Sequence, residues 1–154
     1  MTGPAGLTFL PVTPDREPAA SLLAAARATL TELNDGLDPN SPTMPSAGPA
    51  DFVRFLVGFE HGQPVCCGGL KPLSGGAVEV KRMYVVPAAR GRGVARVLLG
   101  RLEAAARDLG FVATRLDTGP KQASAERMYR EAGYVEIENF NANPIATFFG
   151  EKRL

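Results

Sequence analysis

A glycine-rich segment at residues 90–95 carries the clearest chemical signal in this sequence. It reads Arg-Gly-Arg-Gly-Val-Ala and connects an apolar strand-like run to a run with one apolar helical face. Glycines let the main chain approach a ligand closely, and a helix that begins there aims free N–H groups and the positive end of its dipole at one point. The segment therefore predicts an anion site, for which phosphate is the natural ligand.

The charges around this segment agree with a phosphate site. Residues 79–101 hold six basic side chains against one acidic side chain, a local charge of +5, although the whole chain carries only +1. Two common phosphate motifs are excluded. A Walker A loop needs Lys followed by Ser or Thr where Val94 and Ala95 stand, and a dinucleotide fingerprint needs a third glycine where Arg96 stands.

A second segment with chemical potential runs from Gln122 to Tyr134, beyond one further strand-like run. Within it, Tyr129 is a candidate general acid, because a phenol with an ordinary pKa of about 10 can donate a proton to a reacting group that lies within hydrogen-bond reach. The alternative is a core tyrosine, since Tyr129 lies at helical spacing from Ala125 and Ala132.

Together the two segments resemble the GNAT-superfamily N-acetyltransferases. Arg90, Gly93 and Ala95 fill the family pattern Arg/Gln-x-x-Gly-x-Gly/Ala. The segment from Gln122 to Tyr134 is similar to Asn-x-x-Ala-x-x-x-Tyr-x-x-x-Gly-Phe/Tyr, with Gln122 in place of the usual Asn. The resemblance covers the chain from Phe52 to the C-terminus clearly, and the N-terminal part more loosely.

The resemblance implies a fold, a cosubstrate and a set of contacts. The fold would be one α+β domain over residues 1–154, with a mixed, mostly antiparallel sheet of six to seven strands, flanking helices and a splayed strand pair that holds acetyl-coenzyme A. Main-chain groups of the strand before the loop would hold the pantetheine amides and the acetyl carbonyl. The loop would hold the diphosphate, although a strand-to-helix turn on a solvated basic face is the alternative. The residues implied are Met83, Tyr84, Val85, Arg90, Gly91, Arg92, Gly93, Val94, Ala95, Arg96 and Gln122.

Glu79 is the candidate catalytic base. An alkyl amine arrives mostly protonated, so a group near the cofactor must remove a proton before the amine can attack. Glu79 lies on the strand that leads into the glycine-rich loop, and it would act directly or through one water. An exposed strand glutamate that balances Lys81 is an equally weighted alternative, and some members of the family rely on ordered water instead.

The activity that these residues imply is transfer of an acetyl group to a primary amine of a small molecule or a peptide, by direct attack in a ternary complex. Two rivals from other classes are a non-catalytic acyl-coenzyme A-binding module and a generic nucleotide-binding protein. The acceptor side is expected to be formed by the first helix, the loop at 38–49 and the turn at 139–144. Acidic side chains there, Glu32 among them, would receive a cationic amine, with solvated surface as the default.

The rest of the composition excludes other functions. The 17 basic and 16 acidic side chains nearly cancel, so we expect neither nucleic acid nor a membrane surface as a partner. Cys66 and Cys67 are adjacent and His61 is the only histidine, so we expect no metal site and no histidine-based triad. The absence of a basic leader and of a long apolar run predicts a cytoplasmic protein. We also expect Phe148 or Phe149 to be exposed on the last strand, where either would favour a homodimer.

The elements that must position these residues follow from periodicity and turn signals. The predicted order is strand, helix, three strands, helix, strand, helix and two strands. The predicted strands are 7–12, 51–60, 65–70, 77–86, 111–117, 134–137 and 147–152. The predicted helices are 22–33, 94–109 and 122–132, and the proline-rich stretch at 38–49 is expected to be a loop.

Overall fold

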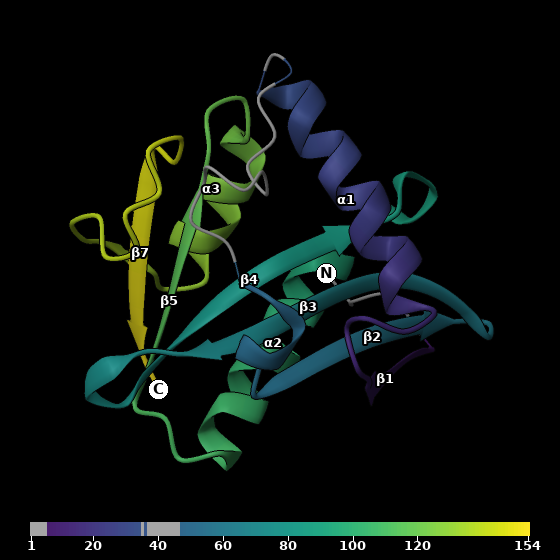
Figure 1. Cartoon of the computed structure of the whole chain (residues 1–154), viewed down its shortest axis with the longest axis horizontal. Helices are drawn as coiled ribbons and strands as arrows, with labels where there is room; N and C mark the ends of the chain where they lie inside the picture. The colour runs from purple at the N-terminus through teal and green to yellow at the C-terminus, as the bar shows by residue number, and fades with distance from the viewer. Residues whose placement is uncertain (1–5, 35, 37–46) are drawn as a thin grey trace.

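A seven-stranded sheet with the order β1-β2-β3-β4-β5-β7-β6 organises the chain. The structure is a computed structural model that describes residues 6–34, 36 and 47–154 (Figure 1). The strands are β1 Leu7–Pro11, β2 Arg54–Glu60, β3 Gln63–Pro72, β4 Ala77–Val85, β5 Ala113–Thr118, β6 Val135–Glu136 and β7 Phe148–Arg153. The α-helices are α1 Ala19–Leu33, α2 Val94–Asp108 and α3 Ala123–Glu131, and short 3-10 helices cover Pro49–Asp51, Ser74–Gly76 and Pro87–Ala89.

The predicted element order and the α+β class are confirmed, and the differences lie at the boundaries. The strand expected at 51–60 begins at Arg54, because a 3-10 turn precedes it in which the Asp51 carboxylate accepts the Gly48 N–H at 2.7 Å. The strand expected at 65–70 extends over Gln63–Pro72. Most of the predicted loop at 38–49 lies outside the described residues.

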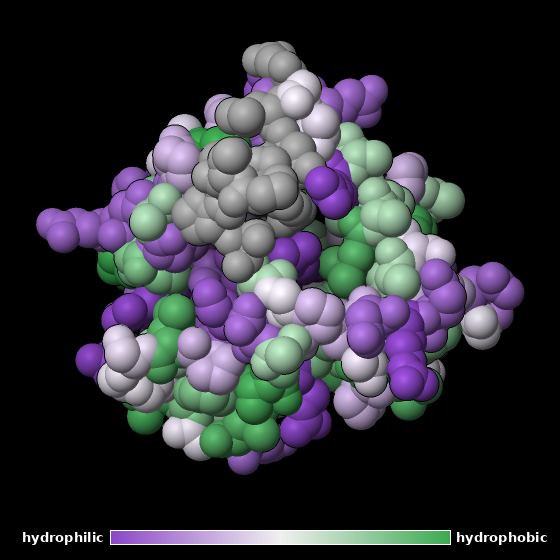
Figure 2. All heavy atoms as spheres, in the orientation of Figure 1, coloured by the Kyte–Doolittle hydropathy of each residue, from purple (hydrophilic) through white to green (hydrophobic). Residues whose placement is uncertain are grey.

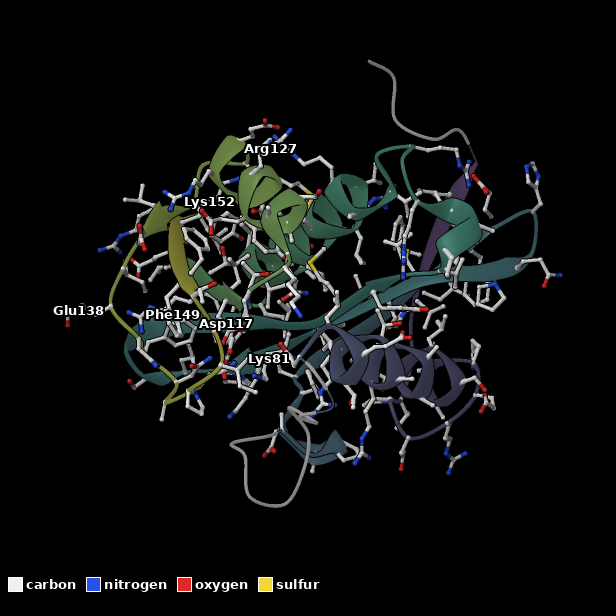
Figure 3. The ribbon with its side chains drawn as sticks, turned by 90° about the horizontal axis from the view of Figure 1, so that it is seen from above. Lys81, Asp117, Arg127, Glu138, Phe149 and Lys152 are labelled. Atoms are coloured by element: carbon white, nitrogen blue, oxygen red, sulfur yellow. The ribbon has the colours of Figure 1, made fainter. Side chains whose placement is uncertain are left out.

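The helices cover opposite faces of the sheet. In the view from above, α2 and α3 lie on one side of the strands and α1 on the other (Figure 3). Leu98 and Leu102 of α2 are fully buried against Val78 of β4, in the larger core. On the other face, Leu22 of α1 packs on Phe55 in a smaller core. α1 and α2 are each held by one apolar stripe, as the spacing of their leucines predicts.

The parallel pair β4–β5 separates soon after it begins. Its three pairings are Ala77 with Ala113, Val78 with Thr114 and Glu79 with Arg115, and the remainder of β4 has no partner on that side within the described residues. A bulge in β4 accompanies the separation. The pairing with β3 moves from Gly69–Lys81 to Cys67–Tyr84, so Arg82 and Met83 lie opposite the single residue Gly68, and Arg82 has a φ of 60°. A bulge bends its strand, and β4 diverges from β5 in Figure 1.

The expectation that Phe148 or Phe149 is exposed is wrong. Phe148 is 0% exposed and Phe149 is 9% exposed. The reason is that β7 is an inner strand, between β5 and β6, with both of its faces covered. The Arg130 guanidinium lies 4.5 Å from the centre of the Phe148 ring, and the Phe140 ring meets Phe149 edge-on at 6.0 Å. The expected homodimer was based on exposure of these side chains, so the structure gives it no support.

The large apolar side chains exposed among the described residues are scattered over the surface. Polar and apolar side chains are interspersed on the face seen in Figure 2. Among the described residues, the large apolar side chains that are exposed come from separate elements, such as Leu10 of β1 and Val135 of β6. None of the helices described is both long enough and apolar enough to cross a membrane.

Candidate functional site

A cavity of about 360 Å³ occupies the space between the separated strands. Residues 80–85 of β4 form one side, and Asp117, Thr118 and Gly119 at the end of β5 form the other. Gln122 and Tyr129 line it from the face of α3, while Ala26, Thr29, Leu30 and Leu33 line it from α1 on the opposite face. The cavity therefore passes through the plane of the sheet, and two molecules can reach its centre from opposite sides.

The glycine-rich loop has the conformation that an anion site needs. Gly91 and Gly93 have φ values of 79° and 80°, in the left-handed region that glycine adopts without strain. Gly93 is the N-cap of α2, and no side chain caps this helix end. The first N–H groups of α2 have no partner within the helix, so they remain available to a ligand.

The predicted arginines diverge in the structure. Arg90 lines the cavity, donates from Nε to the Val85 carbonyl at 2.9 Å and lies 5.6 Å from the centre of the Tyr84 ring. Arg92 instead forms a two-pronged ion pair with Glu60 at 2.9 and 2.8 Å, which draws its side chain toward the end of β2. Hydrogen bonding to Arg92 lowers the pKa of the Glu60 carboxyl. Arg96 is exposed on the first turn of α2.

Gln122, a predicted cofactor contact, lines the cavity, but its side-chain amide oxygen is already used. Oε1 accepts the Gly119 N–H at 2.7 Å and the Thr118 hydroxyl at 3.1 Å. The side chain thus fixes the turn between β5 and α3. Gln122 also lines the cavity, so its amide nitrogen is the atom left to face a ligand.

Tyr129 lies close to β4, the strand whose main chain was predicted to contact the acetyl group. Its hydroxyl lies 4.0 Å from the Met83 sulfur, across the cavity from α3 to β4. Burial and, to a smaller extent, the negative charge of Asp117 raise the pKa of Tyr129 to about 12. The phenol is therefore fully protonated at neutral pH, which is the state that a general acid requires.

Glu79 is not the exposed residue that one interpretation of the sequence described. It is 1% exposed, and its Oε2 accepts from Lys81 Nζ at 3.2 Å and from Asn141 Nδ2 at 2.8 Å. The same Asn141 nitrogen donates to Asp117 Oδ2 at 2.6 Å, and Asn143 donates to that oxygen at 3.2 Å. Lys81 and Asp117, both labelled in Figure 3, line the cavity.

Two residues of this network were not among the predicted site residues. Asp117 lines the cavity, whereas Glu79 is not one of the lining residues. In the sequence, Asp117 ends the strand before the second motif, where a substrate-side group could emerge, and a turn cap is the favoured interpretation there. Asn141 donates to both carboxylates from a loop 62 residues after Glu79. No sequence pattern near Asn141 predicts that contact.

The remaining chemistry-bearing residues have other environments. Burial raises the pKa of the Cys66 thiol to about 11 and that of the Cys67 thiol to about 12, so neither is a nucleophile at neutral pH. His61 occupies the turn between β2 and β3 at a φ of 50°. Within the described ranges, no three His, Cys, Asp or Glu side chains are grouped so that they could hold a metal ion.

Comparison with known proteins places the same segments in one family. The family model described as acetyltransferase (GNAT) family matches residues 27–134. The IAA acetyltransferase of Azospirillum brasilense is 44% identical over 100 residues, which cover 62% of this chain and 65% of that protein. The match thus spans slightly less than two thirds of the relative's own length.

Solved structures agree over nearly the whole chain. A protein described as an acyl-CoA N-acyltransferase, from Klebsiella pneumoniae, is 28% identical with a TM-score of 0.78, over 96% of this chain and 97% of that one. A GNAT family acetyltransferase from Elizabethkingia anophelis, solved with acetyl-CoA bound, shares the fold with a TM-score of 0.73 at 15% identity. That match covers 98% of this chain and 100% of the other.

Proposed function

Because the chain belongs to the GNAT acetyltransferase family, we propose that it transfers the acetyl group of acetyl-coenzyme A to a primary amine, by direct attack in a ternary complex. One observation carries this proposal. The cavity between β4 and β5 is lined from both faces of the sheet, by Arg90 and Tyr129 on one face and by α1 on the other. A thioester donor and an amine acceptor can therefore meet inside it.

The chain's own groups fit the donor. The uncapped start of α2 and the left-handed glycines offer N–H groups to a diphosphate, and the side chain of Arg90 lies close enough to add charge. The main chain of Met83, Tyr84 and Val85 lies beyond the last pairing with β5, so it offers hydrogen bonds to amide groups of pantetheine. Bound acetyl-coenzyme A would supply the activated thioester.

Tyr129 is the proposed general acid. It gives its proton to the coenzyme A sulfur as the C–S bond breaks, and its hydroxyl already lies 4.0 Å from another sulfur, that of Met83. A phenol of pKa about 12 is a weak acid in water, but a thiolate released into the same dry cavity is also held at a high pKa. Cys67 illustrates this effect, since burial raises the pKa of its thiol to about 12.

Glu79 remains the proposed base, and its position favours action through a water. The acceptor ammonium loses a proton toward the pair of carboxylates that Asn141 joins, and Asp117 is the member of that pair that faces the cavity. Glu79, which does not itself line the cavity, takes up the proton. The nitrogen then attacks the acetyl carbon, the C–S bond breaks, and Tyr129 protonates the sulfur.

Calorimetry and a thiol-release assay test this proposal. We expect heat of binding with acetyl-coenzyme A and with coenzyme A, and release of free thiol with at least one class of amine. Gly91→Ala should weaken coenzyme A binding by about tenfold, because Ala at a positive φ disturbs N–H groups that would contact the diphosphate.

Gly110→Ala is the matched control for that variant. Gly110 also has a positive φ, 90°, and open space around its Cα, but it lies at the opposite end of α2. It should lose comparable stability and bind coenzyme A like the wild type. Equal loss of binding in both variants would contradict the diphosphate site. Binding without thiol release from any amine would favour a non-catalytic acyl-coenzyme A module.

A further inference from the structure

Arg82 occupies the most unusual backbone position at the cavity. It belongs to the bulge in β4, and its φ of 60° lies in the left-handed region that non-glycine residues seldom adopt. Strained positions of this kind persist where the surrounding structure holds them, and they concentrate at functional sites. The motif that identifies the cofactor side gives Arg82 no role.

The side chain of Arg82 lies on the face opposite the cofactor loop. Its Nη2 donates to the Ala47 carbonyl at 2.7 Å. It lines the cavity, and it also lines a groove on the outer side of α1 together with Arg27 and Glu32. The next residue, Met83, contacts Tyr129 on the α3 face. Arg82 is therefore placed where an acceptor that enters along α1 meets the centre of the cavity.

Arg82 has no acidic partner among the described residues, although it is half-buried. Two other partly buried cations have an acidic partner. Lys81 pairs with Glu79 at 3.2 Å, and Arg115 pairs with Glu151 at 2.7 Å. Burial, and then the positive charge of Arg27, lower the pKa of Arg82. A half-buried guanidinium beside a second cation is stabilised by an anion.

We propose that Arg82 binds an anionic group of the acceptor, so that the acceptor is an amine that also carries a carboxylate. The cavity presents both of the charges that such a zwitterion needs, since Asp117 faces the ammonium end and Arg82 the carboxylate end. The planar guanidinium donates two parallel N–H bonds to a carboxylate, and a phosphate can use the same donors. This inference rests on the proposed acetyl transfer.

The cationic alternative is less well supported. Glu32 was one candidate to receive a cationic amine, with solvated surface as the default, and it is exposed and lines the groove beside α1, not the cavity. The neighbouring Lys81 is already neutralised by Glu79, whereas no ion pair with an acidic side chain is found for Arg82 among the residues described here. An acceptor with a second positive charge would meet repulsion from Arg82.

The test compares matched acceptors in the thiol-release assay. L-amino acids are compared with their primary amides, which lack the negative charge, and phosphoethanolamine tests a phosphate. We expect kcat/KM for the carboxylates to exceed that for the amides by about tenfold or more. Arg82→Gln should bring this ratio close to one through a higher KM for the carboxylates, and Arg82→Lys should retain part of it. Arg107→Gln, which removes a cation at the far end of α2, should leave the ratio unchanged.

The failures are separable. Calorimetry with coenzyme A is run on every variant and reports both folding and the cofactor site, and titration of the coenzyme A complex with an N-acetyl amino acid reports the Arg82 site without turnover. Amides that react as well as carboxylates, a ratio that Arg82→Gln leaves intact, or a complex that binds no N-acetyl amino acid would overturn this inference. A preference for phosphoethanolamine over every carboxylate would overturn the choice of carboxylate. Loss of coenzyme A binding in the wild type would overturn the proposed function itself.

Discussion

The hydroxyl of Tyr129 lies 4.0 Å from the sulfur of Met83, so a phenol from α3 faces the strand that lines the other side of the cavity. The two residues are 46 positions apart in the chain. Their contact defines the point in the cavity where a leaving sulfur would meet a proton donor.

Tyr129→Phe tests the role of this phenol. The variant removes one oxygen and retains the ring, so we expect kcat to fall by about 100-fold while the Kd for coenzyme A changes less than twofold. Steady-state thiol release and calorimetry measure the two quantities. Tyr134→Phe is the control, because it removes a neighbouring phenol that bonds to Glu103 and should affect stability more than turnover. A Tyr129→Phe enzyme with normal kcat would exclude the phenol as the acid.

Glu79→Gln and Asp117→Asn separate the two carboxylates that share Asn141. Both amides keep an oxygen that can accept the Asn141 N–H, so the fold should persist. For Glu79→Gln we expect kcat to fall by about 100-fold, with a rate that keeps rising with pH toward the pKa of the free amine, near 10. For Asp117→Asn we expect mainly a higher KM. The pH–rate profiles of both variants measure this, and an exchange of the two behaviours would make Asp117 the base.

Glu103 anchors a buried polar cluster that should contribute to stability but not to turnover. It is 6% exposed, accepts the Tyr134 hydroxyl at 2.9 Å and pairs with Lys152 at 3.0 Å. Glu103→Gln removes the charge and should lower the free energy of unfolding by about 2 kcal/mol in urea titrations. The exposed pair of Glu126 and Arg130 gives the comparison, because Glu126→Gln should cost less than about 0.5 kcal/mol. Equal costs would show that the burial of Glu103 has no energetic effect.

The adjacent thiols of Cys66 and Cys67 should not react with thiol reagents at neutral pH. Burial raises the pKa of Cys66 to about 11 and that of Cys67 to about 12, from an ordinary value of 9.0. Ellman's reagent should therefore label the native protein negligibly at pH 8 and label both thiols after unfolding in urea, so thiol release reports coenzyme A alone. Rapid native labelling at pH 8 would contradict the burial of these residues.

The same shifts predict a loss of stability at alkaline pH. Because the folded pKa values are raised, the contribution of the neutral thiols is complete below pH 9 and is lost as the pH rises toward 12. Urea titrations at several pH values should show a decline in the free energy of unfolding over that interval. Cys67→Ala should make the decline less steep, even though the variant is less stable at every pH. An unchanged slope would exclude Cys67 as a contributor.

The periodic and turn-forming parts of this sequence were sufficient to predict the element order. The leucines of α2, the glycines at 91 and 93 and the segment from Gln122 to Tyr134 are local signals, because each reports a conformation that neighbouring residues impose on one another. The anion loop and the position of Tyr129 followed from them. Boundaries such as the start of β2 did not, because a side-chain bond from Asp51 decides where that strand begins.

Long-range contacts decided the rest. Three contacts of the site join residues more than 20 positions apart. They are the hydrogen bonds from Asn141 to Glu79 and to Asp117, and the ion pair between Arg92 and Glu60. The bulge in β4 that contains Arg82, and the inner position of β7 that buries Phe148, are properties of the assembled sheet. Sequence periodicity states which face of an element is apolar. Only the packing of elements against one another determines which charges meet, and so which side of the cavity receives the amine.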